Sequence, residues 1–313
     1  MIKPETCYAI IDAASEPDIF NMLAEYEPPA SCLYSEPIQP EVESLAPYLV
    51  EATEEVQRWL SQRETPWGIY VYTHATMYEL RQHLRKYLMV MIPGQEKPVF
   101  WRFYDPRNVW DVLGTFDNWR LHVFLGPISQ LKTLLWGDEI VSRFERERRG
   151  FPDNAKLGGK LLKFTDSEME LLSEQKVKLL TSKVALFFVR ATEKYNTPNS
   201  EIDIDELVWQ TICNPKILSL KYFTENLCHE KTWEYYFDYA QKVLNICYEY
   251  NIKHNKAISL FSYLIVYSDI YDISIIPDYW YNILSTPNST DFYKVEKLSM
   301  TLIDKIPAFY RQI

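Results

Sequence analysis

Glycine is scarce in this chain, and its distribution constrains the fold more than any other feature. Of the eight glycines in 313 residues, three lie with a proline in the stretch GFPDNAKLGG, Gly150–Gly159. Such a stretch is typical of a linker or lobe boundary, because glycine and proline interrupt regular structure. The scarcity elsewhere disfavours a fold built from many tight hairpins or phosphate-binding loops. We therefore expect two lobes, residues 1–150 and 151–313.

The first lobe mixes the periodicities of strands and helices. Short apolar runs at Cys7–Ala14 and Trp67–Thr73 predict buried strands. Thr76 and Glu79 have the spacing of a capping box, and apolar residues follow at helical intervals. Two apolar segments around Pro93-Gly94 predict a hairpin with a loop of four or five residues. Strands and helices thus alternate as far as about residue 130.

The second lobe carries only helical patterns. Thr165 and Glu168 form another capping-box spacing, which opens a long amphipathic helix running to Tyr195. Further helices are expected at Ile204–Ile212, Lys231–Tyr250, Asn255–Tyr267, Asp278–Leu284 and Thr290–Ile306. The predicted fold class is therefore α+β, with an N-terminal mixed α/β lobe followed by an all-helical C-terminal lobe.

Charge and composition exclude several classes of partner. The formal net charge is −10, and the one dense basic run, Arg143–Gly150, is interrupted by two glutamates, so we expect a solvated helical face and no nucleic-acid partner. We expect neither a signal peptide nor a membrane span, because no charged and apolar leader pattern is found in the first residues and the longest apolar run, Val184–Val189, is short. The five cysteines show no Cys-x-x-Cys spacing, which is typical of reduced thiols in a cytoplasmic protein.

The sequence carries few patterns that are typical of catalytic or metal-binding sites. The five histidines are dispersed, and Cys228-His229, the one adjacent pair, points its side chains apart on a helix. The sequence has no nucleophile elbow, Walker loop or dinucleotide-binding glycine pattern. The acidic run Ser200–Glu206 fits a helix N-terminus better than a calcium loop. A dyad of Cys32 with His74 or His83 stays open, and no catalytic residue, metal or cofactor is predicted.

The stretch FWRFYDPR, Phe100–Arg107, sets four aromatic residues beside two arginines and an aspartate. As a strand, VFWRFY places Val99, Trp101 and Phe103 on one face, and Phe100, Arg102 and Tyr104 on the other. Asp105 then stands where a helix N-cap belongs, with Pro106 as the first helical residue.

Two interpretations of this stretch remain. Arg102 pairs with a carboxylate such as Asp12 at a neighbouring strand end, which is a structural role, or it belongs to a recognition surface. Aromatic residues make up 15% of the chain, which suits a protein-binding surface but also follows from a low-GC genome.

Six segments, in order, give the chain a family resemblance: YAIIDAA (Tyr8–Ala14), CLY (Cys32–Tyr34), LAPYLVEA (Leu45–Ala52), PWGIYVYTHATMYELRQHLRKYL (Pro66–Leu88), FWRFYDPRNVW (Phe100–Trp110) and FLGPI (Phe124–Ile128). Together they resemble a domain-of-unknown-function family whose members are adaptor chaperones for type VI secretion effectors, called Tap or TEC proteins. The resemblance covers residues 7–130 and extends loosely into the helical lobe. The family motif, phenylalanine-arginine-tyrosine-tyrosine-aspartate-proline-arginine, corresponds to Phe100–Arg107. The chain departs from it by inserting Trp101 before the arginine and replacing the first tyrosine with Phe103, or Phe100-Trp101 aligns as the apolar pair that precedes the motif.

The resemblance implies a cytoplasmic bacterial protein that is not an enzyme. Such an adaptor binds a toxic effector and helps to load it onto the VgrG spike, so the implied partners are a type VI effector and VgrG, with no cofactor, nucleic acid or membrane. The motif positions carried over as partner-binding candidates are Asp12, Tyr34, Pro47, Tyr48, Trp101, Arg102, Tyr104, Asp105 and Arg107.

Two functions of other classes stay open. An immunity protein with an acidic surface would block a toxin by mimicking its substrate. A hydrolase or transferase would use scattered polar residues such as Cys32, His74, Asp105 and Arg107.

Overall fold

The chain divides into two compact units, Met1–Ser173 and Glu174–Ile313. The computed structural model describes residues 3–34, 39–152, 155–156, 158–195, 203–217, 230–270 and 272–312. The division lies within the long helix α8 (Asp166–Tyr195) and not in the glycine-rich stretch that begins at Gly150. The reason is that β9 (Leu162–Lys163) returns to the first unit, where it pairs with β5 (Met89–Met91).

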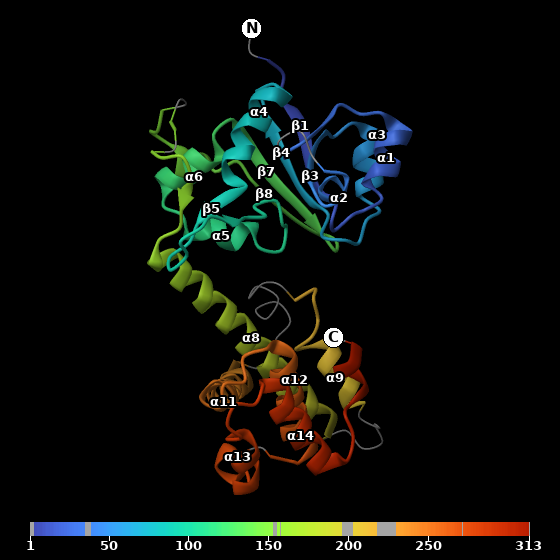
Figure 1. The fold of residues 1–313 in the computed structure, drawn as a ribbon, viewed down its shortest axis with the longest axis vertical. Helices are drawn as coiled ribbons and strands as arrows, with labels where there is room; N and C mark the ends of the chain where they lie inside the picture. Colours follow the sequence, from blue (N-terminus) through green and yellow to red (C-terminus); the bar gives the residue numbers. More distant parts are fainter. Residues whose placement is uncertain are drawn as a thin grey trace. The chain divides into compact units, whose positions relative to one another are not determined.

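The first unit is built on a six-stranded antiparallel sheet (Figure 1). Its strands, in spatial order from one edge to the other, are β2 (Ala30–Cys32), β3 (Pro47–Glu51), β1 (Thr6–Asp12), β4 (Gly68–Thr73), β7 (Ile128–Leu135) and β8 (Asp138–Ser142). A three-stranded sheet beside it consists of β6 (Val99–Phe100), β5 and β9, with β5 in the middle. The predicted strands at Cys7 and Trp67 are therefore confirmed as β1 and β4.

Both faces of the six-stranded sheet are buried at its central strand β1, which explains why β1 is apolar at successive residues. Tyr8 and Ile10 lie in one hydrophobic cluster, and Ala9 and Ile11 lie in another. The helices of this unit are α1 (Ile19–Tyr26), α2 (Pro40–Glu43), α3 (Glu54–Leu60), α4 (Met77–Leu84), the 3-10 turn η1 (Arg85–Tyr87), α5 (Val109–Thr115), α6 (Asn118–Leu125) and α7 (Glu145–Arg148). Helices α4, α5 and α6 cover the first cluster, and α1 and α3 cover the second (Figure 1).

One glycine of the sheet is required by a close approach of two strands. Gly68 has a φ of +150°, and a Cβ atom on it would lie 1.8 Å from the backbone oxygen of Ile10. Gly68 pairs with Ile11 in the β1–β4 register, so no residue with a side chain fits there.

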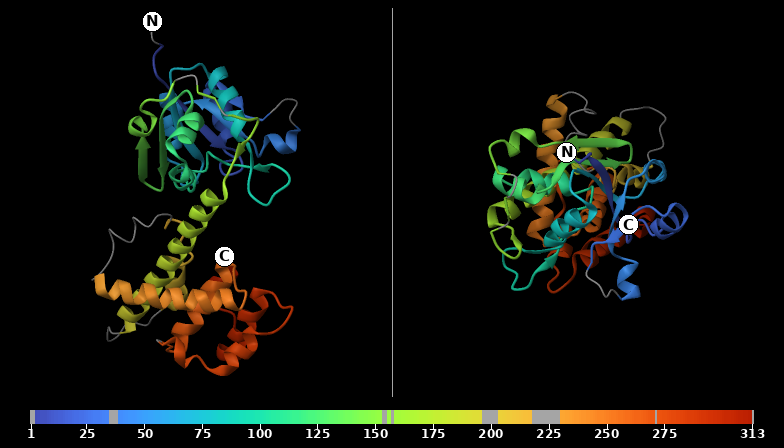
Figure 2. Two further views of the ribbon diagram at one scale, coloured as in Figure 1. Left: turned by 90° about the vertical axis from the view of Figure 1, so that its left-hand side faces the viewer. Right: turned by 90° about the horizontal axis from the view of Figure 1, so that it is seen from above.

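The second unit is all-helical within the described residues, as predicted. Its elements after α8 are α9 (Ile204–Gln210), α11 (Glu230–Glu249), α12 (Asn255–Tyr267), the 3-10 turn η2 (Ile273–Ile275), α13 (Asp278–Leu284), α14 (Asp291–Ile303) and α15 (Ala308–Gln312). Helix α12 is buried around its whole circumference from Ala257 to Val266, and the other helices pack about it. Helix α11 runs across α8 (Figure 2), where the rings of Phe188 and Tyr239 meet at 4.9 Å. The expected α+β class is thus confirmed.

Candidate functional site

Asp12 ends β1 and is held by the turn that follows it. Its carboxylate accepts hydrogen bonds from the Ala14 backbone N–H at 3.3 Å and from the Ser15 hydroxyl at 2.9 Å. The Arg102 Nη1 lies 3.3 Å from the second carboxylate oxygen of Asp12. The predicted pairing of Arg102 with this strand-end carboxylate is therefore confirmed.

The stretch after Phe100 is a turn and not a strand, so the predicted alternation of faces is wrong. Strand β6 ends at Phe100, and the Asp105 N–H closes a turn by donating to the Arg102 carbonyl at 3.0 Å. Phe103 and Tyr104, which the strand would direct to opposite faces, are both fully buried. The turn leaves the Arg102 side chain half-exposed.

The expected helix cap at Asp105 is also wrong. Helix α5 begins at Val109 with Asn108 in the cap position, because Asp105 is already used in the turn before it. The Asp105 carboxylate accepts from the Arg107 backbone N–H at 3.0 Å. It also accepts from the guanidinium of Arg107 at two nitrogens, at 2.9 and 2.7 Å, a bidentate geometry that fixes the direction of this arginine.

Two tyrosines complete the arrangement. The Tyr34 ring meets Phe100 edge-on at 5.7 Å, and burial, followed by the charge of Asp12, raises the pKa of Tyr34. Burial also raises the pKa of Tyr104, with Asp12 again contributing, and its hydroxyl has no hydrogen-bond partner among the described residues. We call Asp12, Tyr34, Arg102, Tyr104, Asp105 and Arg107 the motif cluster.

The three other predicted site residues, Pro47, Tyr48 and Trp101, lie outside the motif cluster. Pro47 pairs with Asp12 in the β1–β3 register, and its carbonyl accepts the Leu33 N–H at 2.9 Å. Tyr48 lies in the cluster of the opposite sheet face, with its ring 5.6 Å from Phe20. Trp101 packs among buried aromatic rings, which are those of Phe103, Phe116, Phe124 and Phe164.

The motif cluster presents two partly exposed guanidinium groups, each of which is already paired with a largely buried carboxylate and keeps further N–H donors for a partner. The side chains of Arg102 and Arg107 are 48% and 41% exposed, whereas those of Asp12 and Asp105 are 6% and 11% exposed. Each carboxylate is already bound by an arginine, so neither is placed as a proton acceptor for a substrate. A guanidinium oriented in this way is suited to bind a carboxylate on a partner. The sequence did not identify Ser15, although its position three residues after Asp12 is typical of a side-chain-closed turn.

The motif cluster lies inside a segment that matches a known protein family. Residues 7–122 match the family described as Domain of unknown function (DUF4123). The match includes every residue of the motif cluster and ends within α6, so the second unit lies wholly outside it. No curated protein and no solved structure matches the chain.

The DUF4123 segment also contains the histidines considered for a catalytic dyad. His83 Nε2 contacts the Phe124 carbonyl at 2.6 Å, and burial lowers the pKa of His83 to about 4. His74 Nδ1 contacts the Lys3 carbonyl at 2.8 Å, and the Cys32 sulfur accepts the Tyr34 N–H at 3.4 Å. The ring nitrogens that these bonds use are therefore directed to backbone oxygens.

Other predicted features fall outside the motif cluster. The pair Cys228-His229 lies outside the described residues, as do Ser200 to Ile202 of the acidic run. The described part of that run caps α9, with Asp203 accepting the Glu206 N–H at 3.1 Å. Across the residues that the structure describes, no group of three or more His, Cys, Asp or Glu side chains could hold a metal ion. No described helix is both long and apolar enough to cross a membrane.

Proposed function

We propose that this protein is a non-enzymatic adaptor chaperone that binds a type VI secretion effector in the cytoplasm and helps to load it onto the VgrG spike. The six sequence segments that resemble such adaptors support this function, and the DUF4123 match over residues 7–122 is consistent with it. The observation that carries the proposal is the motif cluster, because the groups it exposes are guanidinium groups, which bind carboxylates. Two half-exposed arginines are each held by a largely buried carboxylate.

In this function, Arg102 and Arg107 contact acidic groups of the effector or of the spike. Their fixed geometry reduces the conformational entropy lost on binding, which favours a specific contact. The contact stays releasable, because a half-exposed ion pair contributes only about 1 kcal/mol or less. An adaptor that must hand over its cargo needs that moderate affinity.

The test is retention of partners after co-expression. The tagged chain is expressed with the effector and spike proteins encoded beside it, and bound proteins are identified by mass spectrometry. The variant Arg102→Ala/Arg107→Ala is expected to lose about tenfold or more of the retained effector. Arg58→Ala is the matched control, since Arg58 is an exposed arginine on α3 outside the motif cluster.

The outcomes separate the alternatives. If the wild-type chain retains no effector, the adaptor function is wrong. Full retention by the double variant, with an unchanged melting temperature, would place the binding surface elsewhere. A toxin assay on the purified complex distinguishes an immunity protein, which abolishes toxin activity, from an adaptor, which leaves that activity intact.

A further inference from the structure

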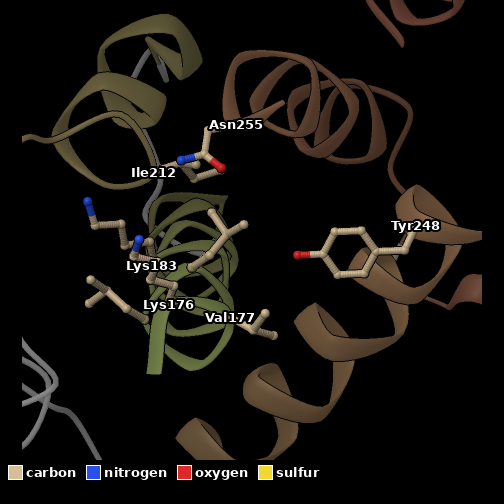
Figure 3. Close-up of a pocket in the computed structure, with 8 residues that line it drawn as sticks. Lys176, Val177, Lys183, Ile212, Tyr248 and Asn255 are labelled. Atoms are coloured by element: carbon tan, nitrogen blue, oxygen red, sulfur yellow. The ribbon is translucent and has the colours of Figure 1, made fainter. Parts of the chain in front are cut away.

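A pocket of about 280 Å³ lies in the second unit, outside the DUF4123 segment (Figure 3). Helix α8 contributes most of its wall, and single residues come from the turn after α9, from α11 and from the start of α12. The residues that line it are Lys176, Val177, Leu179, Leu180, Lys183, Ile212, Tyr248 and Asn255.

The pocket is lined by positive charge, whereas the chain as a whole is negatively charged. Among the described residues that line it, two are lysines and none is acidic, although the chain carries a net charge of −10. The Lys183 Nζ donates to the Asn214 carbonyl at 2.9 Å, which uses one of its three donors. Burial lowers the pKa of Lys183, because desolvation disfavours the charged ammonium group. Among the described residues, no carboxylate lies within ion-pair distance of Lys176 or Lys183.

The rest of the pocket lining is mainly apolar, and two of its side chains are also exposed to solvent. Leu179, Leu180 and Ile212 supply hydrocarbon, and Val177 and Tyr248 are 42% and 37% exposed. In Figure 3, the Tyr248 hydroxyl points from α11 toward the side chains on α8. The volume is at the lower limit for a drug-sized ligand but is large enough for one or two amino-acid side chains.

We propose that this pocket binds an acidic segment of a partner polypeptide, with an apolar side chain seated among Leu179, Leu180 and Ile212 and a neighbouring carboxylate bound by Lys176 and Lys183. The positive lining in an acidic protein argues for the carboxylate, and the small, surface-open volume argues for a side-chain anchor of a polypeptide. The inference rests on the proposed function only in assigning the segment to the carried effector.

The test is calorimetric titration of the purified full-length protein with a model peptide. The probe is acetyl-ELDFEL-amide, and its neutral isostere acetyl-QLNFQL-amide has the same apolar residues without the charge. We expect the acidic peptide to bind about tenfold more tightly than the isostere, with an affinity that falls as salt is raised. Lys183→Met and Lys176→Met, which keep much of the hydrocarbon stem, are each expected to weaken binding by about tenfold.

Lys178→Met is the matched control, because Lys178 is exposed on the same helix and does not line the pocket. Unchanged binding by this control, with loss in the other two variants, supports the site. The inference is wrong if neither peptide binds, if the isostere binds equally, or if the pocket variants bind like the wild type. Octanoate binding as tightly as the peptide would assign the pocket to a free fatty acid. The titration uses no effector, so its failure is distinguishable from failure of co-purification.

Discussion

Gly126 cannot carry a side chain, because its Cα lies against the ring of His83. Gly126 ends α6 with a φ of +51°, and a Cβ atom on it would lie 2.2 Å from the imidazole ring of His83. We expect Gly126→Ala to lower the free energy of unfolding by about 2 kcal/mol or more, through backbone strain and displacement of the ring. Gly114→Ala is the control, because Gly114 lies within α5 with open space around it. That substitution should raise stability by up to about 1 kcal/mol. Equal effects in urea denaturation would contradict this account.

His83 also predicts how stability depends on pH. Burial holds its folded-state pKa at about 4, below the usual 6.5, so the unfolded chain takes up the proton first as pH falls. The stability contributed by neutral His83 is therefore complete above about pH 6.5 and is lost progressively down to about pH 4. The loss is of the order of 2–3 kcal/mol. Denaturation curves across this range should be less pH-dependent for His83→Gln than for the wild type, and parallel curves would rule out His83 as the cause.

Tyr104 and Tyr87 offer a matched comparison of buried hydroxyls. The Tyr87 hydroxyl donates to the Val123 carbonyl at 2.8 Å, whereas that of Tyr104 has no partner among the described residues. Tyr87→Phe should cost about 1 kcal/mol, since it leaves a buried acceptor unpaired. Tyr104→Phe should be neutral or stabilising by a similar amount, because it removes an unsatisfied group. A substantial loss from Tyr104→Phe would show that its hydroxyl has a partner, such as a bound water.

A contact between two side chains could be predicted from the sequence where both residues stand out in the local pattern. Asp12 closes an apolar run and Arg102 stands alone among aromatic residues, so their pairing could be anticipated. The role of Asp105 could not be predicted from the sequence, because Asp-Pro is typical both of a helix cap and of the turn that precedes a helix. The bidentate contact with Arg107 depends on which of these the chain adopts.

The Glu168 side chain both caps the start of helix α8 and joins that helix to α6. The Glu168 carboxylate accepts the Thr165 N–H at 2.7 Å, which completes the predicted capping box with the Thr165 hydroxyl. It also lies 2.8 Å from the Arg120 Nε on α6. Glu168→Gln keeps the cap but removes the charge, so we expect a loss of about 1–3 kcal/mol from the partly buried pair. Hydrogen exchange in the first turn of α8 should rise, and the exposed control Glu170→Gln should change neither quantity.

Long periodic elements were predictable, and short paired ones were not. The bounds of α12 and α13 agree with the expected helices, since caps and a 3.6-residue pattern define them locally. The hairpin of β5 and β6 is confirmed by its pairing, but its connection, residues 92–98, is longer than expected. Strands as short as β6 and β9 carry no detectable period, and their pairing depends on residues distant in sequence. The run at Arg143 forms only the short α7, whose Arg148 is partly buried and donates to the Gly126 carbonyl at 2.7 Å.

At the scale of the whole molecule, the two units have separate hydrophobic clusters. We therefore expect calorimetry to resolve two unfolding transitions. Gly126→Ala should lower the melting temperature of one, and Trp280→Ala, which empties a buried site beside Phe261, should lower that of the other. If both variants shift a single common transition, the units unfold as one cooperative body.

Strand β1 restricts the insertions and deletions that the chain tolerates. Its successive residues serve two different clusters, and its last residue, Asp12, receives Arg102. Removing one residue between Cys7 and Ile11 would exchange the side chains of the two clusters and shift the carboxylate by one position. The length of β1 is therefore constrained by the two hydrophobic clusters and by the contact of Asp12 with Arg102. None of these three constraints applies to the connection from residue 92 to 98. Related chains should accordingly differ by insertions in that connection and keep β1 at constant length.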